Sequence, residues 1–82
     1  MTDLNDYAVE RFIDEYTMRV ENGYRKEFYE SWIEDGAINA DFLFNLIEED
    51  FHEIPDRIRK LILNTMNWDW IEEQINAFIK DQ

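Results

Sequence analysis

Apolar residues recur every three or four positions along this chain, and that spacing constrains the fold more than any other feature. After Leu4, the residues Ala8, Phe12, Tyr16 and Val20 follow at intervals of four. This period places them on one side of an α-helix, whereas a half-buried strand would alternate at every second residue. No apolar run approaches the roughly 20 residues of a membrane-spanning helix. The pattern therefore predicts amphipathic helices that pack against one another.

A few helix-breaking residues divide the chain into short segments. Gly23 and Gly36 are the two glycines, and Pro55 is the single proline. Glycine after a periodic segment suits the left-handed end of a helix, and proline suits the first position of the next helix. Ser, Thr, Asp and Asn favour the N-cap position, so we expect caps at Thr2 or Asp3, at Asn39 and at Asn67. The expected helices run over about residues 3–22 and 24–35, from Asn39 to before Ile54, from Pro55, and from after Asn67.

Together these segments predict an all-α fold, a compact bundle of about five short helices in a single domain over residues 1–82. Isolated helices of this length are marginal in water, so the stability must come from packing their apolar sides together. Four further stripes should be buried. They are Tyr24, Phe28, Tyr29, Trp32 and Ile33; Phe42, Leu43, Leu46, Ile47 and Phe51; Ile58, Leu61, Ile62 and Met66; and Trp68, Ile71, Ile75, Phe78 and Ile79.

Acidic residues greatly outnumber basic ones, and the excess is confined to one part of the chain. Twenty Asp and Glu stand against eight Lys and Arg, a formal net charge of −12. Residues 1–56 hold sixteen of the acids and four of the bases, whereas residues 57–82 hold four of each. A phosphate backbone needs Lys and Arg to neutralise it, and anionic lipid needs the same. We therefore expect neither direct nucleic-acid binding nor docking on a membrane.

The carboxylates of the first three helices fall on the side opposite the apolar stripe. One interpretation is a solvated surface that aids solubility. The other is that rows of carboxylates on rigid helices imitate the phosphates of a nucleic acid. Trp70 lies off the main stripe of its helix, and aromatic residues ringed by charge are favoured anchors at interfaces. The candidate partner-binding residues are Asp3, Asp6, Glu10, Asp14, Glu27, Glu30, Glu34, Asp41, Glu48, Glu49 and Trp70.

These features lead to the hypothesis of a non-enzymatic, acidic binding protein. It would act as an inhibitor that docks on the basic surface of a nuclease or another nucleic-acid-binding protein, by DNA mimicry. In composition the chain resembles phage and plasmid proteins that block host defence, a resemblance that carries over no motif and no residue. The alternative is a helical adaptor or homodimerisation module that uses the neutral, aromatic C-terminal region, namely Trp68, Trp70, Ile75 and Phe78.

Catalytic and metal chemistry find little support in the sequence. There is no cysteine, and His52 is the only histidine. Glu49 and His52 form one Glu-x-x-His pair, whereas a di-iron bundle needs two such pairs and two further glutamates. The segment 35–41 lacks the third-position ligand and the terminal glutamate of a calcium loop. We predict no catalytic residues, no metal and no cofactor, and the absence of a basic and apolar leader favours a cytoplasmic protein.

Overall fold

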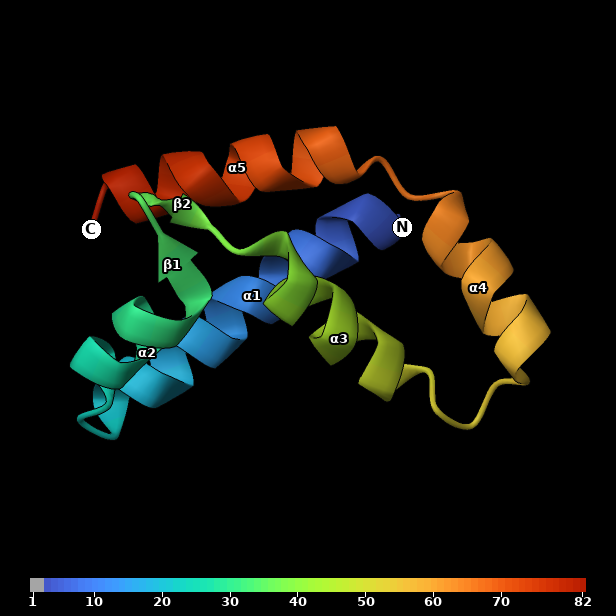
Figure 1. Cartoon of the computed structure of the whole chain (residues 1–82), viewed down its shortest axis with the longest axis horizontal. Helices are drawn as coiled ribbons and strands as arrows, with labels where there is room; N and C mark the ends of the chain where they lie inside the picture. The colour runs from blue at the N-terminus through green and yellow to red at the C-terminus, as the bar shows by residue number, and fades with distance from the viewer. Residues whose placement is uncertain (1–2) are drawn as a thin grey trace.

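Five helices and one two-stranded hairpin make up residues 3–82, the part of the chain that this computed structural model describes (Figure 1). The all-α prediction is confirmed. None of the helices in this range is long and apolar enough to cross a bilayer. The elements are α1 (Leu4–Glu21), α2 (Arg25–Trp32), β1 (Ile33–Glu34), β2 (Ala37–Ile38), α3 (Ala40–Asp50), α4 (Asp56–Asn64) and α5 (Trp68–Lys80).

Side-chain caps define where three of the helices begin, as the sequence predicted. The Asp3 carboxylate accepts hydrogen bonds from the backbone N–H groups of the first turn of α1, the shorter at 2.6 Å. Asn39 Oδ1 accepts from Asp41 N at 3.1 Å, and Asn67 Oδ1 accepts from Trp70 N at 3.1 Å. Each cap satisfies a backbone donor that has no partner inside the helix. The alternative cap, Thr2, lies outside the described residues.

The predicted second helix is too long, because the chain leaves the helix after Trp32 and forms a hairpin. Asp35 and Gly36 both have positive φ, at 54° and 81°. Two consecutive residues in that region, with the sequence Asp-Gly, are typical of a tight turn between antiparallel strands. Ile33 pairs with Ile38 across this turn. Gly36 is therefore a hairpin residue and not the end of a helix.

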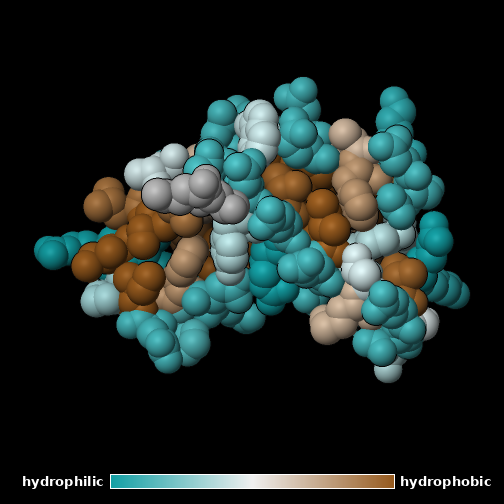
Figure 2. All heavy atoms as spheres, turned by 180° about the vertical axis from the view of Figure 1, so that it is seen from behind, coloured by the Kyte–Doolittle hydropathy of each residue, from teal (hydrophilic) through white to brown (hydrophobic). Residues whose placement is uncertain are grey.

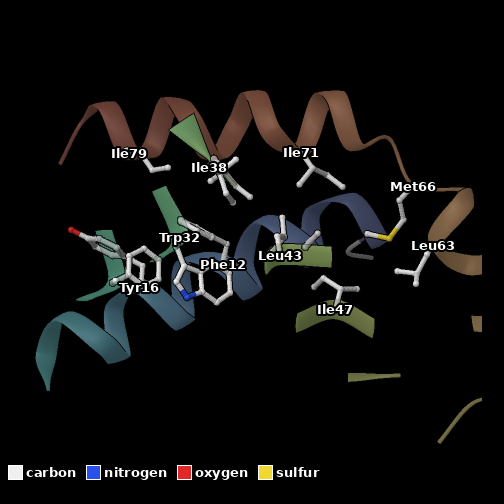
Figure 3. Packing of buried hydrophobic residues seen from close by; sticks show 13 residues of the cluster. Phe12, Tyr16, Trp32, Ile38, Leu43, Ile47, Leu63, Met66, Ile71 and Ile79 are labelled. Carbon is white, nitrogen blue, oxygen red and sulfur yellow. The ribbon is translucent and has the colours of Figure 1, made fainter. Parts of the chain in front are cut away.

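The core forms where α1 lies between the other helices. Figure 1 shows α5 running along one side of α1, with α2 and α3 on other sides. Phe12 is fully buried, and its ring lies 5.6 Å from that of Phe28, 6.0 Å from that of Trp32 and 6.3 Å from that of Phe78. The buried side chains continue along the molecule to Met66, next to α4 (Figure 3). One aromatic residue of α1 thus contacts both α2 and α5.

Helix α4 turns a different side inward from the one predicted. Ile58 and Leu61 were expected in the core but are 43% and 64% exposed, whereas Leu63 is buried. Bonds at the end of α4 determine its rotation. Trp68 Nε1 donates to the Leu63 carbonyl at 3.0 Å, and Asn67 N donates to Asn5 Oδ1 at 2.7 Å. These bonds hold the connection to α5 against the start of α1, with Leu63 pointing into the core.

Smaller corrections concern the ends of other elements. Leu4, Tyr24 and Phe42 were also expected to be buried, but they are 40%, 52% and 41% exposed because each lies at the N-cap or in the first turn of its helix, at the edge of the bundle. Pro55 occupies the N-cap of α4 and not its first helical position. The basic residues of α4 were expected to pair with acids of the third helix, such as Glu53 or Asp50. Arg59 pairs with Asp56 of α4 and with Glu48 of α3, and Lys60 pairs with Asp56, whereas Arg57 has no ion pair among residues 3–82.

Candidate acidic binding surface

A row of carboxylates follows the solvent side of α1 along its whole length. Asp3, Asp6, Glu10 and Asp14 are exposed and follow one another at intervals of three or four residues. At 100° per residue they lie opposite the buried stripe that contains Phe12, and neighbours are about 4.5–6 Å apart along the helix axis. Glu21, which the sequence hypothesis left out, lies on the same side of the helix, seven residues or about 10 Å beyond Asp14. These five residues are called the acidic row below.

The one buried carboxylate of α1 lies outside this row. Glu15 is only 6% exposed and was not among the predicted functional residues. Its carboxylate lies 2.9 Å from Arg19 Nε and 3.4 Å from Arg11 Nη1, each one helical turn away. A buried carboxylate is costly unless cations and donors surround it. Two of the four basic residues in 1–56, Arg11 and Arg19, therefore form ion pairs with Glu15.

The same Arg11 also joins α1 to α3. Its Nε lies 2.9 Å from Asp50 Oδ2, which accepts a second hydrogen bond from the Tyr7 hydroxyl. Burial, together with this bond to an anion, raises the pKa of Tyr7 to about 12. Burial opposes the charged form of Arg11, but Asp50 and Glu15 outweigh it and raise the pKa of Arg11. Asp50 is thus a structural link between two helices.

The other two basic residues of this region lie on α2. Lys26 Nζ is 3.9 Å from Glu30, with both side chains largely exposed, and the Arg25 guanidinium lies 5.6 Å from the centre of the Tyr29 ring. Within residues 3–82, no Lys or Arg forms an ion pair with a member of the acidic row. The charge of this row is therefore left for solvent or for a partner.

The structure distributes the remaining predicted acids over several elements. Glu27 and Glu30 are exposed on α2, and Asp41 and Glu49 are exposed on α3. Glu34 was expected on the same helix face as Glu27 and Glu30, but it lies on strand β1 because α2 ends at Trp32. Glu48 is half-buried and faces Arg59 of α4 at 3.9 Å. Only the α1 acids form one continuous line.

The aromatic C-terminal residues pack mostly inward. Ile75 is fully buried, and the Phe78 ring lies 5.2 Å from that of Tyr16. Trp68 packs against Phe44 at 5.6 Å, and Trp70 is partly buried against the core. Seen from behind, one group of hydrophobic residues lies at the end where α4 lies and another lies on the other side of the largely hydrophilic middle (Figure 2). The most exposed large apolar side chain, Leu61, lies on α4 next to the exposed Ile58, and other exposed apolar side chains lie on α1 and α3. None of these residues belongs to the C-terminal region of the adaptor hypothesis.

Comparisons of the chain with protein-family models, with curated proteins and with solved structures find no match. Residues 3–82 enclose no detectable pocket. In the same range, no group of three or more His, Cys, Asp or Glu side chains converges on a point where a metal ion could bind. The acidic row of α1 is therefore the candidate site that the geometry defines best.

We expect the fold to become more stable as salt is added. Unpaired carboxylates repel one another, and ions screen exposed charges that lie beyond about 10 Å at 0.1 M ionic strength. A gain of about 1 kcal/mol would raise the melting temperature by roughly 4–8 °C in a domain of this size. Thermal unfolding followed by circular dichroism at 10 mM and 200 mM NaCl measures the shift. An unchanged melting temperature would contradict the assignment of the row as unneutralised.

Proposed function

We propose that this protein binds, through its acidic row, the basic nucleic-acid-binding surface of a partner protein and thereby inhibits it. The observation that carries the proposal is that no Lys or Arg of residues 3–82 forms an ion pair with the row. The arginines of α1 pair with Glu15 and Asp50 and not with the carboxylates on its outer side, of which Asp3 also caps the helix. An unneutralised anionic surface complements a basic cleft, which suits a binder better than it suits a catalyst.

The dimensions of the row support an imitation of nucleic acid. Helix α1 is about 27 Å long at 1.5 Å per residue, and carboxylates occur along it about every 6 Å. B-DNA carries one phosphate per roughly 3.4 Å of each strand. The row thus has about half the linear charge density of one strand, on a rigid support. Acids on α2 and α3, among them Glu27 and Asp41, add to the charge outside the row.

Binding of this kind should be fast and should weaken steeply with salt. Complementary surface charges steer two proteins together, and ionic strength reduces that attraction. An apolar interface would instead be insensitive to salt or strengthened by it. The salt dependence of affinity therefore distinguishes this proposal from an interface made through hydrophobic residues.

A competition experiment tests the proposal. The protein is titrated into a panel of nucleases and DNA-binding proteins, each bound to a fluorescent DNA duplex, at 50, 150 and 300 mM NaCl. We expect displacement of the DNA from at least one member, most strongly at low salt. The triple variant Asp6→Asn, Glu10→Gln, Asp14→Asn should bind that member more weakly. At about 0.2–1 kcal/mol per exposed charge pair, three lost pairs weaken binding roughly 3- to 150-fold.

A matched variant distinguishes the loss of carboxylates in the row from the reduction of net charge that accompanies it. Asp69, Glu73 and Asp81 are exposed on or next to α5, away from the row. Replacing these three with Asn, Gln and Asn changes the net charge by the same amount. We expect this variant to bind nearly as tightly as the wild type. Equal losses from the two triple variants, or no displacement of DNA from any protein in the panel, would contradict the proposal.

A further inference from the structure

The outward side of α4 presents an apolar surface that no part of residues 3–82 covers. Ile58 is 43% exposed and Leu61 is 64% exposed, and they lie one helical turn apart. Ile62 follows Ile58 by four residues and is half-buried. Neighbours at these spacings lie on one side of a helix. Leu63, on the other side of the helix, is buried, so Ile58 and Leu61 point away from the core, whereas Ile62 lies at the edge of the exposed surface.

The charges along α4 are arranged against its own dipole. Arg57 and Lys60 lie in the first half of the helix, beside the apolar surface, and no basic residue occurs in the last turn. The N-terminal end of a helix carries partial positive charge and the C-terminal end partial negative charge. Asp56 lies 3.3 Å from Lys60 and offsets part of this arrangement, whereas Arg57 has no ion pair among residues 3–82. A second helix that approached in the opposite direction would place its C-terminal end next to these cations.

We propose that two copies of this chain associate through α4, with the two helices antiparallel around a twofold axis near Leu61. Each Ile58 and Leu61 would then pack against the apolar side of the other helix. The Arg57 and Lys60 side chains of each copy would lie beside the last turn of α4 in the other. A twofold interface uses the same patch on both subunits, so a patch must complement itself. The cation-rich start and cation-free end of α4 meet this condition.

Local charge permits the approach despite the net charge of −12. Residues 57–82 contain equal numbers of acidic and basic residues. The acidic row lies on α1, and ions at 0.15 M screen exposed charges beyond about 8 Å. The helix is about 14 Å long, so the contact is smaller than the roughly 1,000 Å² of a stable interface. We therefore expect a weak dimer that strengthens with salt, because salt screens the repulsion between two chains of net charge −12.

The inference does not depend on the proposed function, because it concerns α4 and not the acidic row of α1. Salt should strengthen the association of two copies but weaken binding through the acidic row. Sedimentation equilibrium from 10 μM to 1 mM in 0.15 M NaCl measures the association of the wild type and of three variants. Leu61→Ser should weaken it at least 10-fold. Met18→Ser is the matched control, since Met18 is 48% exposed on α1, and it should associate like the wild type.

The third variant tests the antiparallel arrangement itself. Asn64→Lys puts a cation in the last turn of α4, where it favours the dipole of its own helix and should leave the melting temperature unchanged or raise it. In the proposed dimer the new cation faces Arg57 of the other copy, so association should weaken several-fold. A wild type that stays monomeric at 1 mM overturns the proposal. So does association that survives Leu61→Ser, or that Asn64→Lys leaves as tight as in the wild type.

Discussion

Replacing Phe12 with alanine should destabilise the fold by about 3–5 kcal/mol, the range for removing a fully buried aromatic ring. The ring contacts Phe28 and Trp32 in α2 and Phe78 in α5, so its loss opens a cavity between three helices. Domains of this size are stable by about 5–15 kcal/mol. The variant should unfold at a much lower urea concentration, which circular dichroism and tryptophan fluorescence both measure.

Phe42→Ala provides the matched control for this prediction. Phe42 is 41% exposed and contacts the core through Trp32, with ring centres 5.6 Å apart. The same chemical change there removes less buried surface, so we expect a loss of about 1 kcal/mol. If both variants unfolded at the same urea concentration, the core would not be centred on Phe12.

Glu15→Gln should cost about 1–3 kcal/mol, the penalty for losing hydrogen bonds between charged groups at a buried site. The substitution keeps the size of the side chain but removes the charge that holds Arg11 and Arg19. Both arginines lie partly in solvent, which keeps the cost below that of a fully buried pair. Urea denaturation at neutral pH measures the change.

Asp14→Asn separates this effect from net charge. Asp14 is the neighbour of Glu15 in sequence, and it is exposed and belongs to the acidic row. Its neutralisation alters the total charge equally but removes no ion pair in residues 3–82, and it relieves repulsion. We expect a change within about 0.5 kcal/mol, in the stabilising direction. Equal destabilisation by the two variants would mean that Glu15 has no special role.

Local signals in the sequence predicted most of the helices correctly. Apolar spacing identified the buried side of α1, and Asn39 and Asn67 marked the starts of α3 and α5 through interactions within a few residues. Each of these features depends on residues only a few positions apart, so the sequence alone is enough to predict it. The Asp35-Gly36 turn was also encoded locally, but its glycine was interpreted as the end of a helix.

Features that depend on contacts between residues far apart in the sequence could not be predicted from these local signals. The bond from Asn67 N to Asn5 Oδ1, 62 residues away in the sequence, holds the end of α4 against the start of α1, and only the folded chain brings these two residues together. The more apolar side of α4 faces outward, against the usual expectation. Periodicity also revealed the line formed by Asp6, Glu10 and Asp14. It could not show that Glu15, one residue further, is buried and binds two arginines.

The pairing of the first helix with the last has a consequence for how the chain folds during synthesis. Helix α5 covers one side of α1, yet it is the last of the seven elements to be made. Until α5 leaves the ribosome, the apolar stripe of α1 has only α2 and α3 to pack against, and Phe12 lacks one of its aromatic contacts. The nascent chain therefore exposes apolar surface until translation of this region is nearly complete. Exposed apolar surface of this kind binds chaperones and favours aggregation.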